Sequence, residues 1–110
     1  MKLSSSIFRS YDIRGKYPHE INEDIAMLLG KTLGARWKTG KVFIGYDARI
    51  SSPSLADALS KGLATARIES SVENVGLITT PMLTYLVHAH HAKAGIMVTA
   101  SHNPAIYNGF

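Results

Sequence analysis

The chain has 110 residues, of which 45% are hydrophobic and 18% are charged, and it contains no cysteine. This length suits one small domain, and the composition is typical of a soluble globular protein. Without cysteine, disulfides, zinc sites with thiolate ligands and cysteine nucleophiles are excluded. The formal net charge of +4 comes from scattered basic residues, which argues against a dedicated nucleic-acid surface and suits a pocket for a small anion.

The N-terminal residues show no targeting signal. Met1–Ser6 contains one lysine without an apolar core after it, and no apolar stretch approaches the roughly 20 residues that span a bilayer. We therefore expect a cytoplasmic protein with neither a membrane nor a nucleic acid as its partner.

The segment Ile7–Gly15 has no helical periodicity and mixes aromatic, basic and glycine residues. It suits a loop that lines a binding site, because Gly15 can adopt positive φ and the planar guanidinium of Arg14 matches a phosphate or carboxylate. A surface turn with a solvated arginine explains the same residues equally well, so both interpretations stay open.

A first helix is predicted from about Glu23 to Trp37. Asn22 is a suitable N-cap, and two acidic residues in the first turn favour the helix dipole. Apolar residues recur at intervals of three and four and form one face. We expect Trp37 to pack in the core or at its edge. The residues of this face are Ile25, Leu28, Leu29, Leu33 and Trp37.

Val42–Tyr46 predicts a buried strand, followed by a loop and a second helix that runs to about Ala66. Ser52 as N-cap with a proline at the first helical position is a typical helix start. Asp47 and Arg49 follow the strand directly, so they could reach a site at its carboxyl end. The interpretation that we favour slightly is an ion pair that braces the loop.

The next elements are a short strand over Val72–Val75 and a third helix from Thr80 to about His91. Within that helix, His88 and His91 share a face and invite a metal site. Two histidines without a nearby carboxylate or cysteine make a poor metal site, so helix surface is the better interpretation.

Ala94–Val98 is an apolar run that predicts a buried central strand. Pro104 disfavours helical geometry before it and cannot donate a ladder hydrogen bond, so the strand ends here. Ser101 would then lie at the carboxyl end of a strand, where open α/β sheets bind their ligands. The alternation of helices and strands predicts an α/β fold with three layers, α/β/α, around a mostly parallel or mixed sheet.

Ser101 does not match a serine hydrolase. A nucleophile elbow has glycine two residues on either side, whereas Thr99 and Asn103 occupy these positions here. His102 is adjacent, and adjacent side chains on extended backbone point apart. We expect no reaction of Ser101 with a fluorophosphonate probe. A serine that accepts a phosphoryl group needs cations and an acid or base, which Arg14, His102 and a metal would supply.

The motif Thr99–Pro104 resembles the active-site serine signature of the α-D-phosphohexomutases. Four further motifs match in the same order and span most of the chain. The Tyr-Asp-Ile-Arg-Gly version of the first motif resembles the phosphomannomutase/phosphoglucomutase branch. The further motifs are Phe8–Gly15, Gly45–Arg49, Thr80–Pro81 and Tyr107–Gly109.

This resemblance implies an isomerase that interconverts hexose 1-phosphate and 6-phosphate, with a hexose 1,6-bisphosphate as intermediate and activator. Ser101 would carry the phosphoryl group, and Mg²⁺ would be held by its phosphate and by aspartates of a second domain. Arg14 would contact the phosphoserine region and the substrate, Tyr11 would bind the phosphosugar, and His102 would assist proton transfer or orientation.

The resemblance also implies four domains, of which residues 1–110 cover domain I, incomplete at its C-terminal end. The other domains of the same chain would then be required partners, and the 110-residue piece alone is expected to be inactive. The alternative function is a non-catalytic module that binds phosphosugars or another protein.

Overall fold

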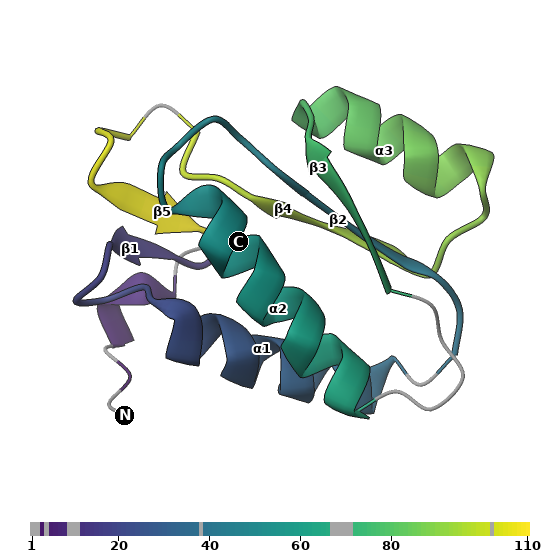
Figure 1. Cartoon of the computed structure of the whole chain (residues 1–110), viewed down its shortest axis with the longest axis horizontal. Coiled ribbons are helices and arrows are strands. Elements are labelled where there is room, and N and C mark those ends of the chain that lie inside the picture. The colour runs from purple at the N-terminus through teal and green to yellow at the C-terminus, as the bar shows by residue number, and fades with distance from the viewer. Residues whose placement is uncertain (1–2, 4, 9–11, 38, 67–71, 102) are drawn as a thin grey trace.

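The computed structural model describes residues 3, 5–8, 12–37, 39–66, 72–101 and 103–110. The helices of this part of the chain are a 3-10 turn η1 (Ser5–Ile7), α1 (Glu23–Arg36), α2 (Ser52–Ala66) and α3 (Thr80–Ala89). Its strands are β1 (Arg14–Lys16), β2 (Val42–Tyr46), β3 (Val72–Leu77), β4 (Ala94–Val98) and β5 (Tyr107–Gly109) (Figure 1).

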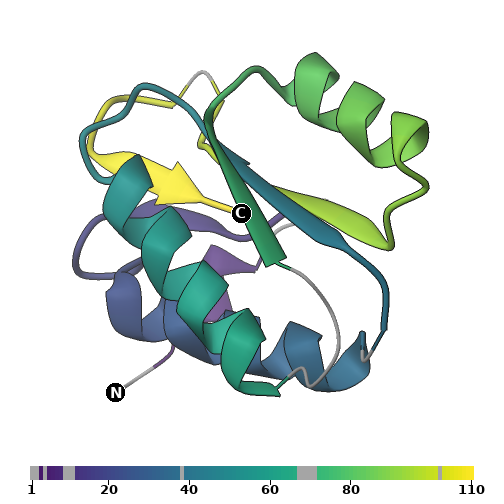
Figure 2. The same ribbon diagram turned by 45° about the vertical axis from the view of Figure 1, so that its right-hand side comes forward.

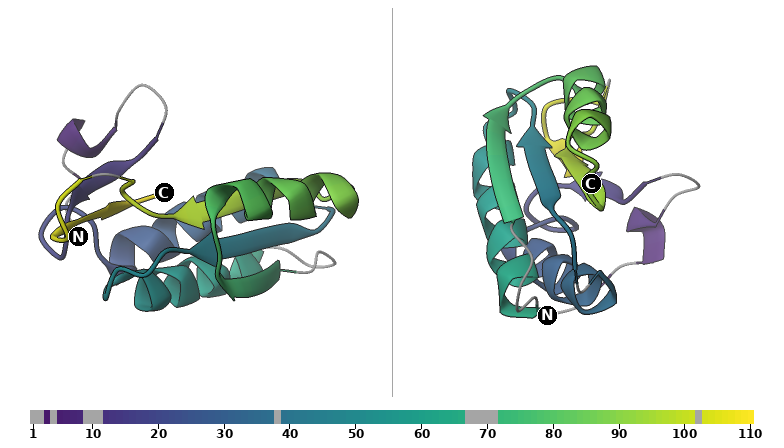
Figure 3. Two further views of the ribbon diagram at one scale, coloured as in Figure 1. Left: turned by 90° about the horizontal axis from the view of Figure 1, so that it is seen from above. Right: turned by 90° about the vertical axis from the view of Figure 1, so that its right-hand side faces the viewer.

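Three strands form a parallel sheet in the order β3-β2-β4. Val42 lies opposite Val72 on one side and Ala94 on the other, so the three strands begin at one level. Helix α2 covers one face of this sheet and α3 covers the other, as the right-hand view of Figure 3 shows. Helix α1 runs beside α2 (Figure 1). The predicted three-layer α/β/α fold with a mostly parallel sheet is therefore confirmed.

The starts of α1 and α3 follow the capping signals. The Asn22 side chain accepts from the backbone N–H of Ile25 at 3.0 Å, and Thr79 caps α3 in the same way. The predicted ends differ by a few residues: α1 ends at Arg36, α3 ends at Ala89, and β3 extends to Leu77. The prediction of Ser52 as N-cap is wrong, because α2 begins at Ser52 itself and the Ser52 hydroxyl donates to Asp47.

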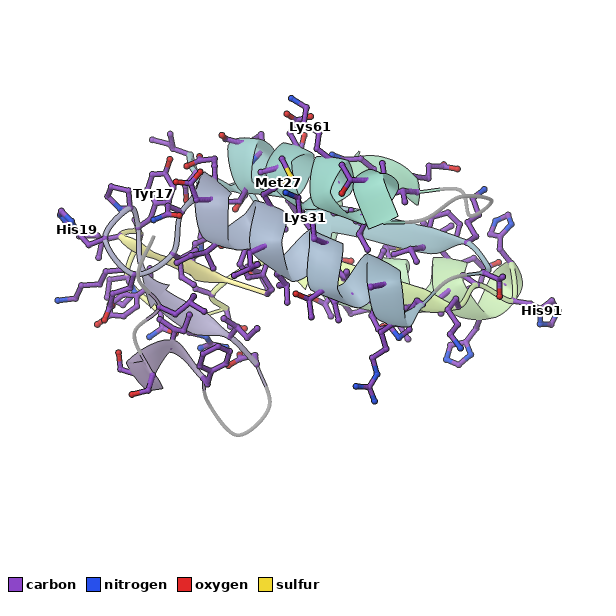
Figure 4. The ribbon with its side chains drawn as sticks, turned by 90° about the horizontal axis from the view of Figure 1, so that it is seen from below. Tyr17, His19, Met27, Lys31, Lys61 and His91 are labelled. Carbon is purple, nitrogen blue, oxygen red and sulfur yellow. The ribbon has the colours of Figure 1, made fainter. Side chains whose placement is uncertain are left out.

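Fewer residues of α1 are fully buried than its apolar pattern predicted. Ile25 is buried, and most of the other predicted face residues pack against the core while partly exposed, but Leu28 is 36% exposed. The residues of α1 closest to α2 are small. A Cβ on Gly30 would stand 2.4 Å from the Leu59 carbonyl oxygen, so a larger residue would not fit there. A Cβ on Gly62 would stand 2.3 Å from the Met27 carbonyl oxygen. Figure 4 shows Met27 and Lys31 where α1 runs beside α2.

The core lies between the sheet and the pair α1 and α2. Most of its fully buried members come from β2, β4 and α2, and Ile7, Ile21 and Ala26 join them from η1, from the segment just before α1 and from the start of α1. The partly buried Trp37 packs against the core as predicted. The principal core side chains are Ile21, Val42, Ile44, Leu55, Leu59, Leu63 and Val98.

The last two residues of the segment predicted as a loop, Arg14 and Gly15, belong to strand β1 instead, and residues 9–11 of that segment lie outside the described residues. Strand β1 pairs with β5 in an antiparallel two-stranded sheet, with Arg14 opposite Gly109 (Figure 2). A Cβ on Gly109 would stand 2.0 Å from the Ile13 carbonyl oxygen, so the pairing requires glycine there. Local sequence could not reveal this pair, because its two strands lie near opposite ends of the sequence.

Only His88 lies within α3, since the helix ends at Ala89 and His91 has a φ of +51°, so His88 and His91 do not share a helical face as predicted. His88, His90 and His91 are exposed, and Figure 4 shows His91 projecting away from the molecule. The His90 ring lies 5.6 Å from the Phe43 ring. None of the helices that the structure describes is long and apolar enough to span a membrane.

Candidate functional site

Ser101 stands on the loop that follows β4, as predicted, but β4 is an outer strand of the described sheet and β2 is the central one. Ser101 is exposed and has a φ of +53°, in the left-handed region that non-glycine residues rarely adopt. Ala100 before it is fully buried, and its carbonyl accepts from the N–H of Asn103 at 3.0 Å. The loop therefore turns sharply and presents Ser101 outward.

Asp47 connects the ends of β2 and β4. Its Oδ2 accepts from the Thr99 hydroxyl at 2.6 Å, and its Oδ1 accepts from the Ser52 hydroxyl at 2.6 Å. Burial by itself raises the pKa of Asp47, but hydrogen bonds from Ser52, Thr99 and Arg49 outweigh burial and lower the pKa below its ordinary value. The carboxylate is therefore ionised at neutral pH.

Arg49 uses every N–H of its guanidinium group on the site. Nε donates to Asp47 Oδ2 at 3.1 Å, so the ion pair that the sequence favoured is present. The four remaining N–H groups reach backbone carbonyl oxygens of the serine loop and of the start of β5. These oxygens belong to Ser101 at 2.7 Å, Pro104 at 2.8 Å, Asn103 at 2.9 Å and Tyr107 at 3.1 Å.

Arg14 reaches the same loop from β1. Its Nη1 donates to the side-chain oxygen of Asn103, and its Nη2 forms an ion pair with Asp12. The side chain is only 21% exposed, so the interpretation as a solvated surface turn is wrong. Its Nε is buried and has no hydrogen-bond partner among the described residues.

Two predicted site residues, Tyr11 and His102, lie outside the described residues. The structure brings together the others, Ser101 and Arg14, through Asn103. Sequence reasoning missed the bracing role of Asn103 and of Asn108. The only signal for them was their place in motifs, since both roles depend on contacts with distant segments.

Asn108 is fully buried and holds β5 against the start of α2. Its Nδ2 donates to the Ser51 hydroxyl at 2.7 Å and to the Ser52 hydroxyl at 2.9 Å. Ser52 in turn donates to Asp47. A chain of hydrogen bonds therefore runs from β5 through the start of α2 to the end of β2.

An open groove lies beside this network, at the carboxyl ends of the parallel strands. It is lined by Asp47 and Thr99 on one side and by Thr79 and Thr80 at the start of α3 on the other. This is the edge at which open α/β sheets bind ligands. Among the described residues, no group of three or more histidine, cysteine, aspartate or glutamate side chains forms a metal site.

Comparison with known proteins agrees with this geometry. The family model for phosphoglucomutase/phosphomannomutase, alpha/beta/alpha domain I, matches residues 5–110. A protein of Xanthomonas campestris named for phosphohexose mutases is 45% identical over 102 residues, which cover 93% of this chain and 22% of that protein. A phosphomannomutase of Klebsiella pneumoniae is 43% identical over 102 residues, which cover 93% of this chain and 64% of that protein.

A crystal structure of a phosphoglucomutase/phosphomannomutase family protein from Burkholderia thailandensis superposes with a TM-score of 0.83 at 34% identity. The superposition covers 99% of this chain and 26% of that one. The chain thus spans about a quarter or less of the length of most of these relatives. It belongs to the phosphoglucomutase/phosphomannomutase family.

Proposed function

We propose that this chain carries the phosphorylated serine of a mutase that interconverts hexose 1-phosphate and 6-phosphate, with mannose or glucose phosphates as substrates. The observation that carries the proposal is the presentation of Ser101. It is exposed on a left-handed turn at the ligand-binding edge of the sheet, and Arg14 and Arg49 both bind its loop.

In the proposed reaction, phosphorylated Ser101 donates its phosphoryl group to a free hydroxyl of a hexose monophosphate. The bond between Ser101 Oγ and phosphorus breaks as a bond from the sugar oxygen forms, the sugar hydroxyl proton passes to a base, and the departing Ser101 Oγ takes up a proton. The product is a hexose 1,6-bisphosphate. In the second transfer Ser101 Oγ gives up its proton as it accepts the other phosphoryl group, and the departing sugar oxygen takes up a proton, which releases the isomeric monophosphate and restores the phosphoserine.

Guanidinium groups at the loop favour this chemistry, because a transferring phosphoryl group is stabilised by cations that are already in place. Arg14 and Arg49 provide two such groups, and each is held by a carboxylate, Asp12 and Asp47 respectively. Substrate binding by Tyr11 and proton transfer or orientation by His102 complete the proposal, from their places in the matched motifs.

Magnesium is part of the proposal only through Ser101. Mg²⁺ prefers hard oxygen ligands, and a phosphate on Ser101 would supply one. The described residues do not make a magnesium site on their own, since no acidic cluster lies among them. No step above passes through a metal, and the remaining ligands would come from other domains of the same chain.

The test uses the protein from the complete reading frame, because the described chain spans only part of its relatives. Conversion of glucose 1-phosphate and mannose 1-phosphate is measured with Mg²⁺ and catalytic glucose 1,6-bisphosphate. Ser101→Ala should lower turnover by about 10³-fold or more, while Ser5→Ala, an exposed serine on η1, should leave it unchanged.

Near-normal turnover of Ser101→Ala would contradict the phosphoserine assignment. Tight phosphosugar binding by the wild type without any turnover would favour the non-catalytic module instead.

A further inference from the structure

We propose that Asp47 and Arg49 form a positioning pair that sets the backbone conformation of Ser101 and thereby the direction of its Oγ for phosphoryl transfer. The inference rests on the proposed function, since it concerns the same serine. It adds two residues that act through the backbone and touch neither the sugar nor the phosphate.

The first argument is the conformation itself. At a φ of +53°, the Cβ of a serine crowds its own backbone, so this conformation persists only where surrounding contacts hold it. A relaxed loop would return Ser101 to negative φ and turn its hydroxyl to a different direction. Something in the structure must therefore stabilise the left-handed state.

Both peptide groups that flank Ser101 are held by this one pair. The N–H of Ser101 donates to Thr99 Oγ1 at 3.1 Å, and that hydroxyl donates to Asp47 Oδ2 at 2.6 Å. The carbonyl of Ser101 accepts from Arg49 Nη2 at 2.7 Å. Because φ and ψ are the rotations between these two peptide groups, fixing both groups fixes where the Cβ points.

The guanidinium group is suited to this task in a way that an ammonium is not. It binds three carbonyl oxygens of the serine loop, the Tyr107 carbonyl oxygen at the start of β5 and the Asp47 carboxylate at the same time. All of its N–H groups are then occupied, so it has none left for a direct hydrogen bond to a phosphate. Arg49 is therefore a positioning residue, and only its charge acts on the phosphoryl group.

The experiment measures a single phosphoryl transfer. Full-length protein, first dephosphorylated, is mixed with glucose 1,6-bisphosphate and Mg²⁺, and phosphorylation of Ser101 is followed over time by mass spectrometry. The rate constant reports the positioning of Ser101, whereas the amplitude reports the fraction of folded, competent protein. A purely structural role would change the amplitude and leave the rate constant alone.

Two variants break the pair in different places. Arg49→Lys keeps the charge but loses most of the carbonyl contacts, and Thr99→Val removes the link from Asp47 to the Ser101 N–H. We expect each to lower the rate constant by about 10-fold to 100-fold, because a displaced nucleophile loses its alignment with the phosphorus atom. The matched controls are Arg36→Lys and Thr84→Val, which change exposed residues on α1 and α3.

Unchanged rate constants in Arg49→Lys and Thr99→Val would overturn the inference, with or without a lower amplitude. If one variant does not fold, the other decides. Failure of the proposed function has a different signature, because wild-type protein would then acquire no phosphate on Ser101. Recovery of the rate constant in Arg49→Ala by free guanidinium, but not by methylammonium, would support the inference independently.

Discussion

The Arg14 guanidinium donates a hydrogen bond to the side-chain oxygen of Asn103, a residue 89 positions farther along the chain and two positions after Ser101. The same guanidinium pairs with Asp12, so one planar group joins the first strand to the serine loop. This contact explains why an arginine near the start of the sequence belongs to a site formed near residue 101.

Arg14→Lys should lower kcat/KM of the complete enzyme by about 10-fold to 100-fold, or ~1.4–2.7 kcal/mol of transition-state stabilisation. A lysine keeps the charge but cannot bind Asn103 and Asp12 together. Steady-state kinetics with glucose 1-phosphate measures the effect, and Lys31→Arg on the exposed side of α1 is the control. Unchanged kinetics would leave Arg14 with no part in the reaction.

Asn108→Ala should lower the free energy of unfolding by about 2–3 kcal/mol. The substitution removes both hydrogen bonds to Ser51 and Ser52 and leaves a buried space between β5 and α2. Urea denaturation measures the change. Asn74→Ala removes one solvent-exposed hydrogen bond, from the Gly76 N–H on β3, and should cost below about 1 kcal/mol, so equal losses in both variants would contradict the bracing role.

Gly62→Ala should destabilise the domain by about 2–4 kcal/mol, because the added methyl group would overlap the Met27 carbonyl oxygen and push α1 away from α2. Thermal unfolding measures the loss. Lys31→Ala, which changes an exposed side chain near the same contact, is the control and should leave the midpoint nearly unchanged. A stable Gly62→Ala protein would mean that the two helices can separate without cost.

Asp47 should make stability depend on pH in the acid range. Its folded pKa lies below the ordinary value of 3.8, so its ionised form is favoured by folding. The contribution is therefore complete above that ordinary value and disappears as the pH falls through the lower folded pKa. The difference in unfolding free energy between wild type and Asp47→Asn should therefore shrink as the pH falls through the folded pKa of Asp47.

Urea denaturation at a series of pH values between neutrality and the acid limit tests this dependence. Asp57→Asn serves as the control, because Asp57 forms an exposed surface pair with Lys61, and such pairs contribute little. A constant difference between wild type and Asp47→Asn across the acid range would argue against the depressed pKa.

Much of the fold could be predicted because its signals are local. Asn22, Ser52 and Thr80–Pro81 mark helix starts within a few residues, and the apolar runs over β2 and β4 show directly in the sequence. Strand β1 could not be predicted, since its pairing with β5 depends on a glycine far along the chain. The same limit hid the small-residue contact between α1 and α2.

Part of the candidate site could likewise be predicted from local sequence and part could not. Ser101 could be placed at the end of a strand from the apolar run before it and the proline after it. The bracing by Arg49 could be predicted only as an ion pair with Asp47, because its four other partners are backbone oxygens, which carry no sequence signature. The role of Asn108 depends on burial that only the assembled fold creates.

The pairing of β1 with β5 has a consequence for folding during translation. Translation delivers β2, β3 and β4 before β5, so the nascent chain can complete its parallel sheet while β1 still lacks the strand that it pairs with in the finished fold. Ile13 and Phe110 exchange backbone hydrogen bonds, which close the pair only after residue 110 has left the exit tunnel. The strand that carries Arg14 therefore pairs with β5 only after the serine loop has been synthesised.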